Sequence, residues 1–287
     1  MDVARTVEHI RRAVARARGE RRAIGLVPTM GALHDGHFGL IEAARSQCGF
    51  VVVSIFVNPL QFSPSEDLAA YPRREEEDLS ACEARGVDAV FLPPVEVMYP
   101  RPCLTEVSVA KLAAGLCGRS RPGHFAGVAT VVAKLLHITQ PDHAYFGAKD
   151  YQQAVVIRRM VEDLNFAVRI VICPTVREVD GLAMSSRNKY LTPDQRRQAA
   201  ALRQALQLAE DLIRAEHPSA EAVIGAVRGR LAEQAPDGAV DYVQIVDPEE
   251  LWDVERTDRA VLVALAVKFG RARLIDSVLV DGGQVGG

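Results

Sequence analysis

The segment AIGLVPTMGALHDGH, residues 23–37, decides the fold. It opens with an apolar run at 23–27, which is typical of a strand buried on both faces of a parallel sheet. A turn with paired glycines and histidines follows, and a helix is predicted from about residue 37 to 47. Where a helix starts, its first amide N–H groups lack intrahelical partners and lie at the positive end of the helix dipole. The sequence therefore predicts an anion site formed by free N–H groups in this turn.

Strand and helix patterns alternate on both sides of this segment. Apolar runs predict strands at 50–57, 89–92, 143–146 and 168–172, and periodic patterns predict helices at 3–18, 72–85, about 128–136 and after 150 to about 164. Such alternation requires a parallel sheet covered by helices, and these sheets bind ligands at the carboxyl ends of their strands. The predicted fold class is α/β, with a Rossmann-like N-terminal domain over residues 1–175.

The pattern changes in residues 176–287, where we expect a smaller α+β domain. The segment TPDQ at 192–195 is a capping box with proline at the first helical position, and it predicts a long helix to about residue 216. A second helix is predicted at 220–234 and strands at 240–246, 261–268 and 274–280, before a frayed tail at 282–287.

The composition limits the classes of function. Of 287 residues, 48% are hydrophobic and 25% are charged, and the formal net charge is -3, which gives no electrostatic reason to expect a nucleic-acid partner. No apolar run reaches the length of a membrane span, and residues 1–20 contain no hydrophobic signal core. The five cysteines are scattered without a CxxC pair, which predicts reduced, buried thiols. We therefore expect a cytoplasmic protein with no membrane partner.

A second segment, MSSRN at 184–188, complements the first. Its hydroxyls and guanidinium are groups that hold phosphate by charge-assisted hydrogen bonds. A zinc site is the alternative for His34 and His37, but the sequence offers neither further ligands nor an HExxH helix beside them. We therefore predict that the two segments bind the phosphate chain of a nucleotide.

Five motifs in order carry a resemblance to a known family: PTMGALHDGH at 28–37, SIFVNPLQF at 54–62, RPGHFAGV at 121–128, FGAKDYQQ at 146–153 and DGLAMSSRN at 180–188. The HxGH turn with a later serine- and arginine-containing loop resembles the nucleotidyltransferase superfamily. The whole set is similar to its pantoate–β-alanine ligase family, over about residues 1–280. This resemblance implies ATP-dependent ligation of pantoate to β-alanine through a pantoyl adenylate, with Mg²⁺ accompanying ATP. It also implies a homodimer.

The resemblance implies roles for individual residues. His37 is the candidate general acid that protonates the departing pyrophosphate. The further catalytic candidates, which supply charge and hydrogen-bond donors, are His34, Lys149, Ser185, Ser186 and Arg187. The residues expected to bind ATP are Met30, Gly31, Ala32, Leu33, His34, Asp35, Gly36, His37, Gly147, Ala148, Lys149, Asp150, Val176, Met184, Ser185, Ser186 and Arg187.

Uncharged amides at strand ends are the candidates for the acid substrates, because they can hydrogen-bond hydroxyl and carboxylate groups. Pantoate binding is expected of Asn58, Gln61 and Gln153, and Gln61 is also expected to contact β-alanine. For any single glutamine, exposure on the surface is the alternative.

Several of these residues also fit plainer structural roles. Lys149 and Asp150 fit a solvated ion pair, and Val176 and Met184 fit a hydrophobic core. The charged run 73–78 fits an exposed helix face, or a magnesium site at Glu77 and Asp78. For the whole chain, the competing hypotheses are another HxGH adenylyltransferase acting on a nucleotide or phosphopantetheine, and a non-catalytic nucleotide- or RNA-binding module.

Overall fold

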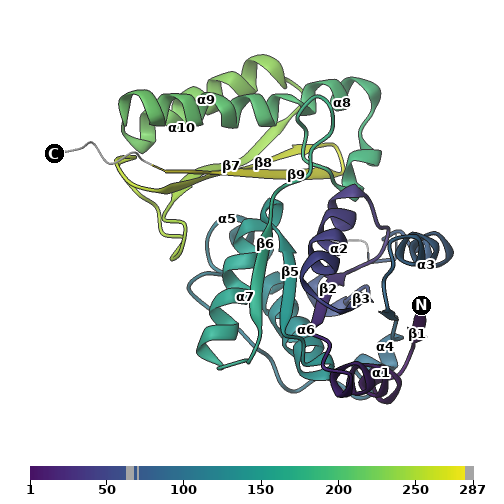
Figure 1. Ribbon diagram of the computed structural model, residues 1–287. Coiled ribbons are helices and arrows are strands. Elements are labelled where there is room, and N and C mark those ends of the chain that lie inside the picture. Colours follow the sequence, from purple (N-terminus) through teal and green to yellow (C-terminus); the bar gives the residue numbers. More distant parts are fainter. Residues whose placement is uncertain (63–67, 70, 282–287) are drawn as a thin grey trace. The chain divides into compact units, whose positions relative to one another are not determined.

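The computed structural model describes residues 1–62, 68–69 and 71–281. The chain divides into two compact units (Figure 1). Unit 1 comprises residues 1–113, 121–148 and 153–174, and unit 2 comprises 114–120, 149–152 and 175–287. From the sequence we expect a continuous division into residues 1–175 and 176–287. In the structure, unit 2 also includes the two short segments 114–120 and 149–152.

Unit 1 is built on a six-stranded parallel sheet with the order β1-β4-β3-β2-β5-β6. Because β2 has β3 on one side and β5 on the other, the strand order reverses beside β2, and such a switch point is where open α/β sheets bind ligands. The strands are β1 (Asp2–Ala4), β2 (Ile24–Thr29), β3 (Phe50–Ile55), β4 (Ala89–Phe91), β5 (His143–Gly147) and β6 (Arg169–Cys173).

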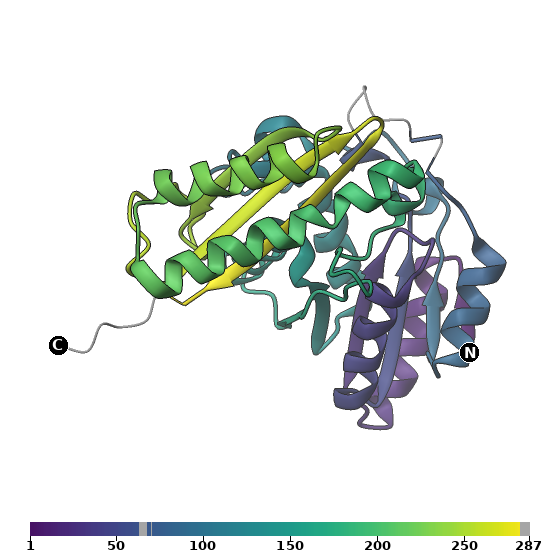
Figure 2. The same ribbon diagram turned by 90° about the horizontal axis from the view of Figure 1, so that it is seen from above.

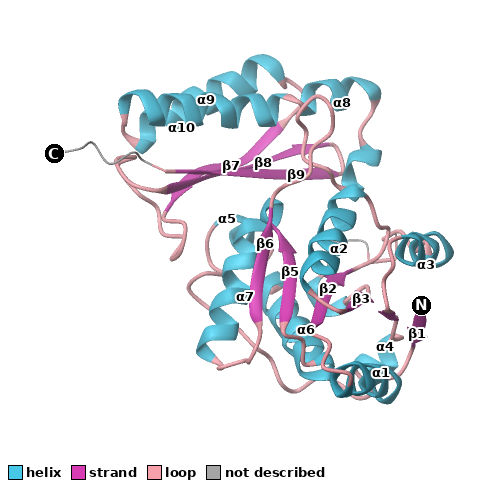
Figure 3. Ribbon diagram, in the orientation of Figure 1, coloured by secondary structure: helices cyan, strands magenta, loops and turns pink. Residues whose placement is uncertain are grey.

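Helices cover both faces of this sheet (Figures 1 and 3). The helices of unit 1 are α1 (Val7–Gly19), α2 (Asp35–Gln47), α3 (Glu75–Ala84), α4 (Val95–Met98), α6 (His124–Thr139) and most of α7 (Tyr151–Asp163). The short 3-10 turns η1 (Pro59–Gln61) and η2 (Ala148–Asp150) follow β3 and β5.

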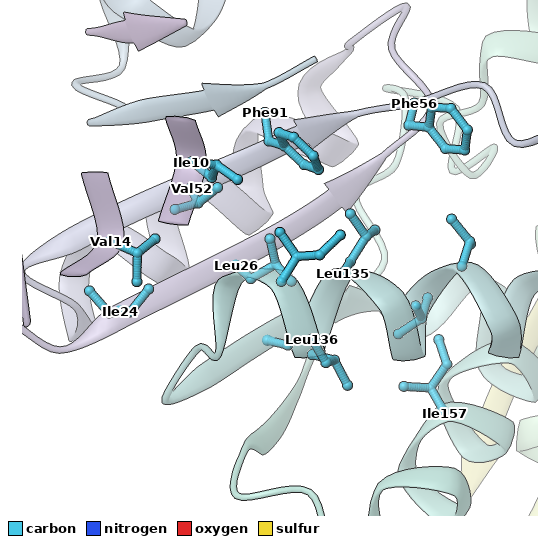
Figure 4. Close-up of a cluster of buried hydrophobic side chains, with 14 of the residues drawn as sticks. Ile10, Val14, Ile24, Leu26, Val52, Phe56, Phe91, Leu135, Leu136 and Ile157 are labelled. Atoms are coloured by element: carbon cyan, nitrogen blue, oxygen red, sulfur yellow. The ribbon is translucent and has the colours of Figure 1, made fainter. Parts of the chain in front are cut away.

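The alternation of side chains along β2 explains why residues 24–27 are all apolar. Ile24 and Leu26 pack into a core with α1, α6 and α7, as Figure 4 shows for Leu135 and Leu136. Val27 points to the opposite core, which includes residues of α2 and α3. Both faces of the strand are therefore buried, as expected for a central parallel strand.

Unit 2 contains an antiparallel sheet of β7 (Ala239–Val246), β8 (Val261–Phe269) and β9 (Ala272–Val280). Its core joins the sheet to α9 (Ala201–Glu216) and α10 (Ala220–Gln234), which lie along one face of the sheet in Figure 2. The remaining elements of unit 2 are α5 (Leu116–Ser120), η3 (Ser186–Tyr190) and α8 (Pro193–Ala199).

The predicted fold class is confirmed: an α/β Rossmann-like parallel sheet is accompanied by a smaller α+β region. Two features differ from the prediction: a first strand that was not expected and a helix that is divided. Residues 3 and 4, which were predicted as helix, lie in β1 instead, because Thr6 caps α1 and starts it at Val7. The long helix predicted at 193–216 is divided at Ala200 into α8 and α9. The tail predicted at 282–287 lies outside the described residues.

The cysteines differ in one respect from the prediction. All five are free thiols, and burial raises the pKa of Cys82 to about 12. Four of them are buried, but Cys103 is exposed, so the prediction of a buried thiol is wrong for that residue. Within the described residues, no helix is both long and apolar enough to cross a membrane.

Candidate active site

The turn between β2 and α2, here called the HDGH turn (residues 30–37), has an unusual backbone. Gly31 and Ala32 both have left-handed conformations, with φ of 79° and 49°. The amide of Gly31 donates to Thr29 Oγ1 at 3.1 Å, and the Thr29 hydroxyl donates to the Ser54 carbonyl on β3 at 2.8 Å. The start of the turn is therefore fixed to the neighbouring strand.

Asp78, in the first turn of α3, holds the next part of the HDGH turn. Its Oδ2 accepts the amide of Ala32 and its Oδ1 accepts the amide of Leu33, each at 2.8 Å. Burial raises the pKa of Asp78, and these amide hydrogen bonds oppose that shift. Asp78 is only 2% exposed, so the prediction of an exposed helix face is wrong for this member of the run 73–78.

The two histidines cap the start of α2 reciprocally. Nδ1 of His34 accepts the amide of Gly36 at 3.1 Å, and Nδ1 of His37 accepts the amide of His34 at 3.3 Å. Since each Nδ1 is an acceptor, the hydrogen-bond pattern assigns the ring proton of both histidines to Nε2. The ring centroids are 4.2 Å apart. The turn thus holds two imidazoles together, each with a protonated Nε2.

These contacts correct the prediction of free amides. In the turn, the N–H groups of five residues donate to side chains of unit 1: Gly31, Ala32, Leu33, His34 and Gly36. The acceptors are a threonine hydroxyl, the Asp78 carboxylate and the two imidazoles. The prediction is wrong for these amides because it considered only the helix that starts in the turn, and not the acceptors around it.

A buried amide cluster lies after β3. Asn58 is 1% exposed, and its side-chain amide donates to Gln61 Oε1 at 3.2 Å and to the Gly127 carbonyl at 3.0 Å. Its Oδ1 accepts the hydroxyl of Tyr99 at 2.9 Å and the amide of Leu60 at 3.3 Å. All the hydrogen-bonding groups of the Asn58 carboxamide are therefore engaged, which favours a supporting role for this predicted pantoate ligand.

Gln61 connects the amide cluster to the HDGH turn. Its side-chain amide lies 2.8 Å from Met30 Sδ, while its carbonyl oxygen faces Asn58. Its backbone carbonyl lies 2.8 Å from His124 Nδ1. The structure thus brings the candidate for acid binding against a residue predicted to bind ATP.

The close approach of α6 explains a glycine in this region. A Cβ at Gly127 would lie 2.2 Å from the Leu60 carbonyl oxygen, so only glycine allows this helix to contact η1. The other candidates of unit 1 are near the end of β5. Gly147 is its last residue, Ala148 begins η2, and Gln153 lies in the first turn of α7, half-buried.

In unit 2, Val176 and Met184 face each other across a narrow hairpin. The amide of Met184 donates to the Val176 carbonyl at 3.0 Å, and Arg177 pairs with Ala183 in an antiparallel bridge. Gly181, with φ of 88°, makes the turn. Both residues, which are expected to bind ATP, are half-buried and neither belongs to the core of unit 2, so a purely core role does not describe them.

The loop after this hairpin, here called the SSRN loop (residues 185–188), is held by a polar network. The Asn188 amide donates to Glu178 Oε1 at 2.7 Å and to the Ala183 carbonyl at 3.1 Å. Arg196 of α8 binds Glu178 and Asp180, each at 2.5 Å, and its hydrogen bond lowers the pKa of Asp180. This network fixes the end of the loop at Asn188. Ser186 and Arg187 come just before Asn188 in the chain, and their side chains are not part of the network.

Within the loop, Ser185 caps η3 by accepting the amide of Arg187 at 3.2 Å. Within the described part of the chain, the side chains of Ser186 and Arg187 take part in no polar contact of the protein. The guanidinium of Arg187 and the hydroxyl of Ser186 are therefore not used in holding the loop.

Lys149 and Asp150 form the ion pair expected as their alternative, with Nζ 3.2 Å from the carboxylate. The Lys149 side chain is 17% exposed, so it is not a solvated surface group. Next to them, the buried Gln152 accepts the amide of Cys117 at 3.0 Å and donates to the Gly115 carbonyl at 2.9 Å. These contacts fix the segment 149–152 to the segment 114–120 within unit 2.

The sequence missed several residues that shape these sites. Asp78, Tyr99, Glu178 and Arg196 were not candidates for positioning, because each acts on a partner distant in the sequence or on a backbone group. No group of three or more His, Cys, Asp or Glu side chains with metal-binding geometry occurs among the described residues. Glu77 forms an ion pair with Arg74 at 3.0 Å, and Asp78 uses both oxygens on backbone amides, so this pair does not fit a magnesium site.

The chain is similar to known proteins over almost its whole length. The family model described as pantoate-beta-alanine ligase matches residues 2–279. A pantothenate synthetase of Moorella thermoacetica is 54% identical over 281 residues, which cover 98% of this chain and 99% of the relative. A second relative with that name, from Desulfitobacterium hafniense, is 50% identical over 98% of this chain and 100% of its own length.

Solved structures agree with the sequence relatives. The crystal structure of pantothenate synthetase from Thermus thermophilus has a TM-score of 0.91 and 46% identity, covering 97% of this chain and 99% of that one. A pantoate-beta-alanine ligase from Francisella tularensis, in complex with beta-gamma ATP and beta-alanine, has a TM-score of 0.79 and 34% identity over 97% of both chains. The chain therefore belongs to the pantoate–β-alanine ligase family.

Proposed function

We propose that this chain condenses pantoate with β-alanine and cleaves ATP to AMP and pyrophosphate, through an enzyme-bound pantoyl adenylate. The observation that carries the proposal is the contact between Gln61 and Met30. It brings an amide suited to an acid substrate against the turn predicted to bind ATP. A carboxylate that attacks a phosphorus atom requires this proximity, because positioning accounts for much of the catalysis of such steps.

In the first step, an oxygen of the pantoate carboxylate attacks the α-phosphorus of ATP. A new oxygen–phosphorus bond forms, and the bond from the α-phosphorus to the bridging oxygen of pyrophosphate breaks. His37 is suited to assist because its Nε2 carries a proton, so the ring can donate a hydrogen bond to the negative charge that develops on the departing pyrophosphate. Nε2 of His34 is a second donor of the same kind.

The cationic groups of unit 2 are suited to neutralising the phosphate chain. We assign Lys149, Ser186 and Arg187 to phosphate contacts, while Ser185 shapes the loop as the cap of η3. Val176 and Met184 are assigned to adenine, which suits their half-buried, apolar side chains. Gly147, Ala148 and Asp150 are assigned to the ribose and its phosphate.

In the second step, the amine of β-alanine attacks the acyl carbon of pantoyl adenylate. The carbon–nitrogen bond of pantothenate forms, the carbon–oxygen bond to AMP breaks, and the amine loses a proton. Gln61 and Gln153 are assigned to pantoate, with Gln61 also near β-alanine. Asn58 is assigned to orienting Gln61, since its own polar groups are engaged.

We further propose that Mg²⁺ enters with ATP on its phosphate oxygens, as is usual in nucleotide sites. No step is assigned to it, because Glu77 and Asp78 do not fit as its ligands. A homodimer and a cytoplasmic location complete the proposal. Sedimentation equilibrium tests the dimer, and cell fractionation tests the location.

The test of the function is the release of AMP from ATP and Mg²⁺ by the purified chain. We expect AMP only when both pantoate and β-alanine are present, with pantothenate formed in equal amount. Pantoate alone should support exchange of labelled pyrophosphate into ATP. Release of pyrophosphate only on addition of a nucleotide monophosphate or phosphopantetheine would instead identify an adenylyltransferase of the same superfamily.

A further inference from the structure

The HDGH turn has the shape of an anion site, but the anion it holds is part of the chain. Consecutive backbone N–H groups in a turn with left-handed residues form a concave donor site that binds negative charge. Here the donors are the amides of Ala32 and Leu33, and the acceptor is the carboxylate of Asp78. Each oxygen takes one amide at 2.8 Å.

The fit around this carboxylate is close. A Cβ at Gly31 would lie 2.9 Å from Asp78 Oδ2 and 3.0 Å from Ile55 Cγ2. The left-handed conformation of Ala32 is unfavourable for a residue with a Cβ, so it requires contacts that hold it. The Asp78 carboxylate supplies two of these contacts, on the amide of Ala32 itself and on the amide after it.

The positions of the histidines follow from this part of the turn. His34 comes directly after Leu33, and its side chain and carbonyl cap the start of α2. The amide of His34 is in turn the donor that fixes Nδ1 of His37. A shift of residues 32–33 would therefore move both imidazoles. The amide of Leu33 binds Asp78, and the next residue, His34, both caps α2 and binds Nδ1 of His37.

We propose that Asp78 is a positioning residue, which serves as the built-in anion of the HDGH turn and holds its histidines in the orientation that binds ATP. The proposal rests on the proposed role of this turn in ATP binding. It assigns Asp78 to the protein's own backbone and not to a metal ion. Its effect on ATP binding is therefore independent of Mg²⁺.

The test compares two variants of one helix. Asp78→Asn keeps the size of the side chain but replaces one acceptor oxygen with a donor that faces a backbone amide. Glu76→Gln removes the same charge from the exposed side of α3 and is the matched control. ATP is titrated calorimetrically in EDTA without pantoate, and the KM values for ATP and pantoate are measured with Mg²⁺ by pyrophosphate exchange.

We expect Asp78→Asn to weaken ATP binding about tenfold or more in EDTA, as the loss of a charge-assisted hydrogen bond would. The KM for pantoate should stay within about twofold of wild type, and Glu76→Gln should behave as wild type. Nitrogen NMR of the imidazoles gives an independent signature. Protonation restricted to Nε2 of His34 and His37 should give way to a mixture of tautomers in Asp78→Asn.

A second variant at the same position tests whether the placement of the carboxylate, and not only its charge, affects ATP binding. Asp78→Glu keeps the charge but lengthens the side chain, so it should also weaken ATP binding in EDTA if the placement of the carboxylate matters. The proposal is overturned if either folded variant binds ATP in EDTA as wild type does. A requirement for more Mg²⁺ as the only defect would instead make Asp78 a metal ligand. If wild type itself performs no pantoate-dependent exchange, the proposed function fails before the variants are compared.

Discussion

The HDGH turn of unit 1 and the SSRN loop of unit 2 are both predicted to bind phosphate, but they are built in opposite ways. In the HDGH turn, the backbone amides are used internally on Asp78 and on the imidazoles. In the SSRN loop, the network of Asn188, Glu178 and Arg196 fixes the backbone. The side chain of Arg187 takes no part in that network.

The difference shows that two segments predicted to bind phosphate can present different groups. One presents the imidazoles of a turn whose backbone amides are already bonded, and the other presents a guanidinium on a loop whose backbone is held by side chains. The HDGH turn presents neutral donors in a fixed orientation, which suits assistance to a leaving group. The SSRN loop presents a positive charge, which suits binding. Variants in the HDGH turn should therefore reduce kcat in addition to weakening ATP binding, whereas variants in the SSRN loop should raise the KM for ATP with little change in kcat.

The strongest test of this comparison is His37→Ala. Removal of one positioned hydrogen-bond donor to developing negative charge typically costs about 10²–10³-fold, and we expect a loss of that size in the rate of pantoate-dependent pyrophosphate exchange. His37→Gln keeps a hydrogen-bond donor and an acceptor in the side chain, so it should recover part of the rate. The circular dichroism spectra of both variants should match wild type. Exchange at the wild-type rate in His37→Ala would remove this residue from the catalytic set.

The next largest effect is expected from Gly127→Ala, which tests whether backbone packing supports the site of unit 1. The new Cβ would lie 2.2 Å from the Leu60 carbonyl oxygen, and such overpacking costs up to about 3 kcal/mol in the free energy of unfolding. Urea denaturation measures this loss, and the KM for pantoate should rise as η1 moves.

Gly225→Ala is the control, because it lies exposed in α10 of unit 2 with nothing within 4 Å of the new Cβ. In an exposed helix, alanine should instead stabilise by about 0.5–1 kcal/mol. Equal effects of the two substitutions would show that the contact between α6 and η1 is not needed.

A smaller effect is expected from Arg187→Lys in the SSRN loop. Lysine keeps the charge but loses the planar fork of the guanidinium, so we expect a rise of about tenfold in the KM for ATP with little change in kcat. Arg187→Ala should raise the KM further. A fall in kcat at unchanged KM would contradict the assignment of this loop to binding.

The smallest effect is the response of unit 2 to acid. Arg196 lowers the pKa of Asp180. Burial acts to raise the pKa of Asp241, but hydrogen bonds from Arg273 and Ser120 outweigh it, and the net shift is downward. A carboxylate with a lowered pKa stabilises the folded state above its unfolded pKa of about 3.9, and this contribution is lost as the pH falls through the folded pKa. Unit 2 should therefore lose stability as the pH falls from about 5 to below 3.

The single tryptophan, Trp252, lies in unit 2 and reports this transition by its fluorescence during urea denaturation. Asp241→Asn should flatten the dependence on pH in this range, whereas Glu233→Gln, on the exposed side of α10, should not. An unchanged pH profile in Asp241→Asn would contradict the prediction.

The sequence predicted those features that depend on neighbouring residues. The strand β2, its turn and α2 follow from an apolar run, paired glycines and a polar helix start within residues 23–37. The capping box at Thr192 and Gln195 is equally local and is present in the structure. Motif positions that resembled a known family also located the candidate residues in the chain.

The features that were missed depend on distant partners. The acceptor for the amide of Ala32 is Asp78, 46 residues away, and it ends an acidic run that resembles an ordinary helix start. Tyr99 reaches Asn58 across 41 residues, and Arg196 reaches Glu178 across 18. A single sequence shows the residue types but not which of them pack against each other in the fold. It therefore could not predict which acceptors bind the backbone amides of the HDGH turn.

The anchoring of Gln152 has a consequence for work with fragments of this protein. The chain passes between the units at 113/114, 120/121, 148/149, 152/153 and 174/175. A fragment ending at residue 174 would keep Gln152 and its segment but lose most of unit 2, and the complementary fragment would lack Lys149. Splitting the gene at that linker should therefore give two pieces that regain activity only when they are produced together.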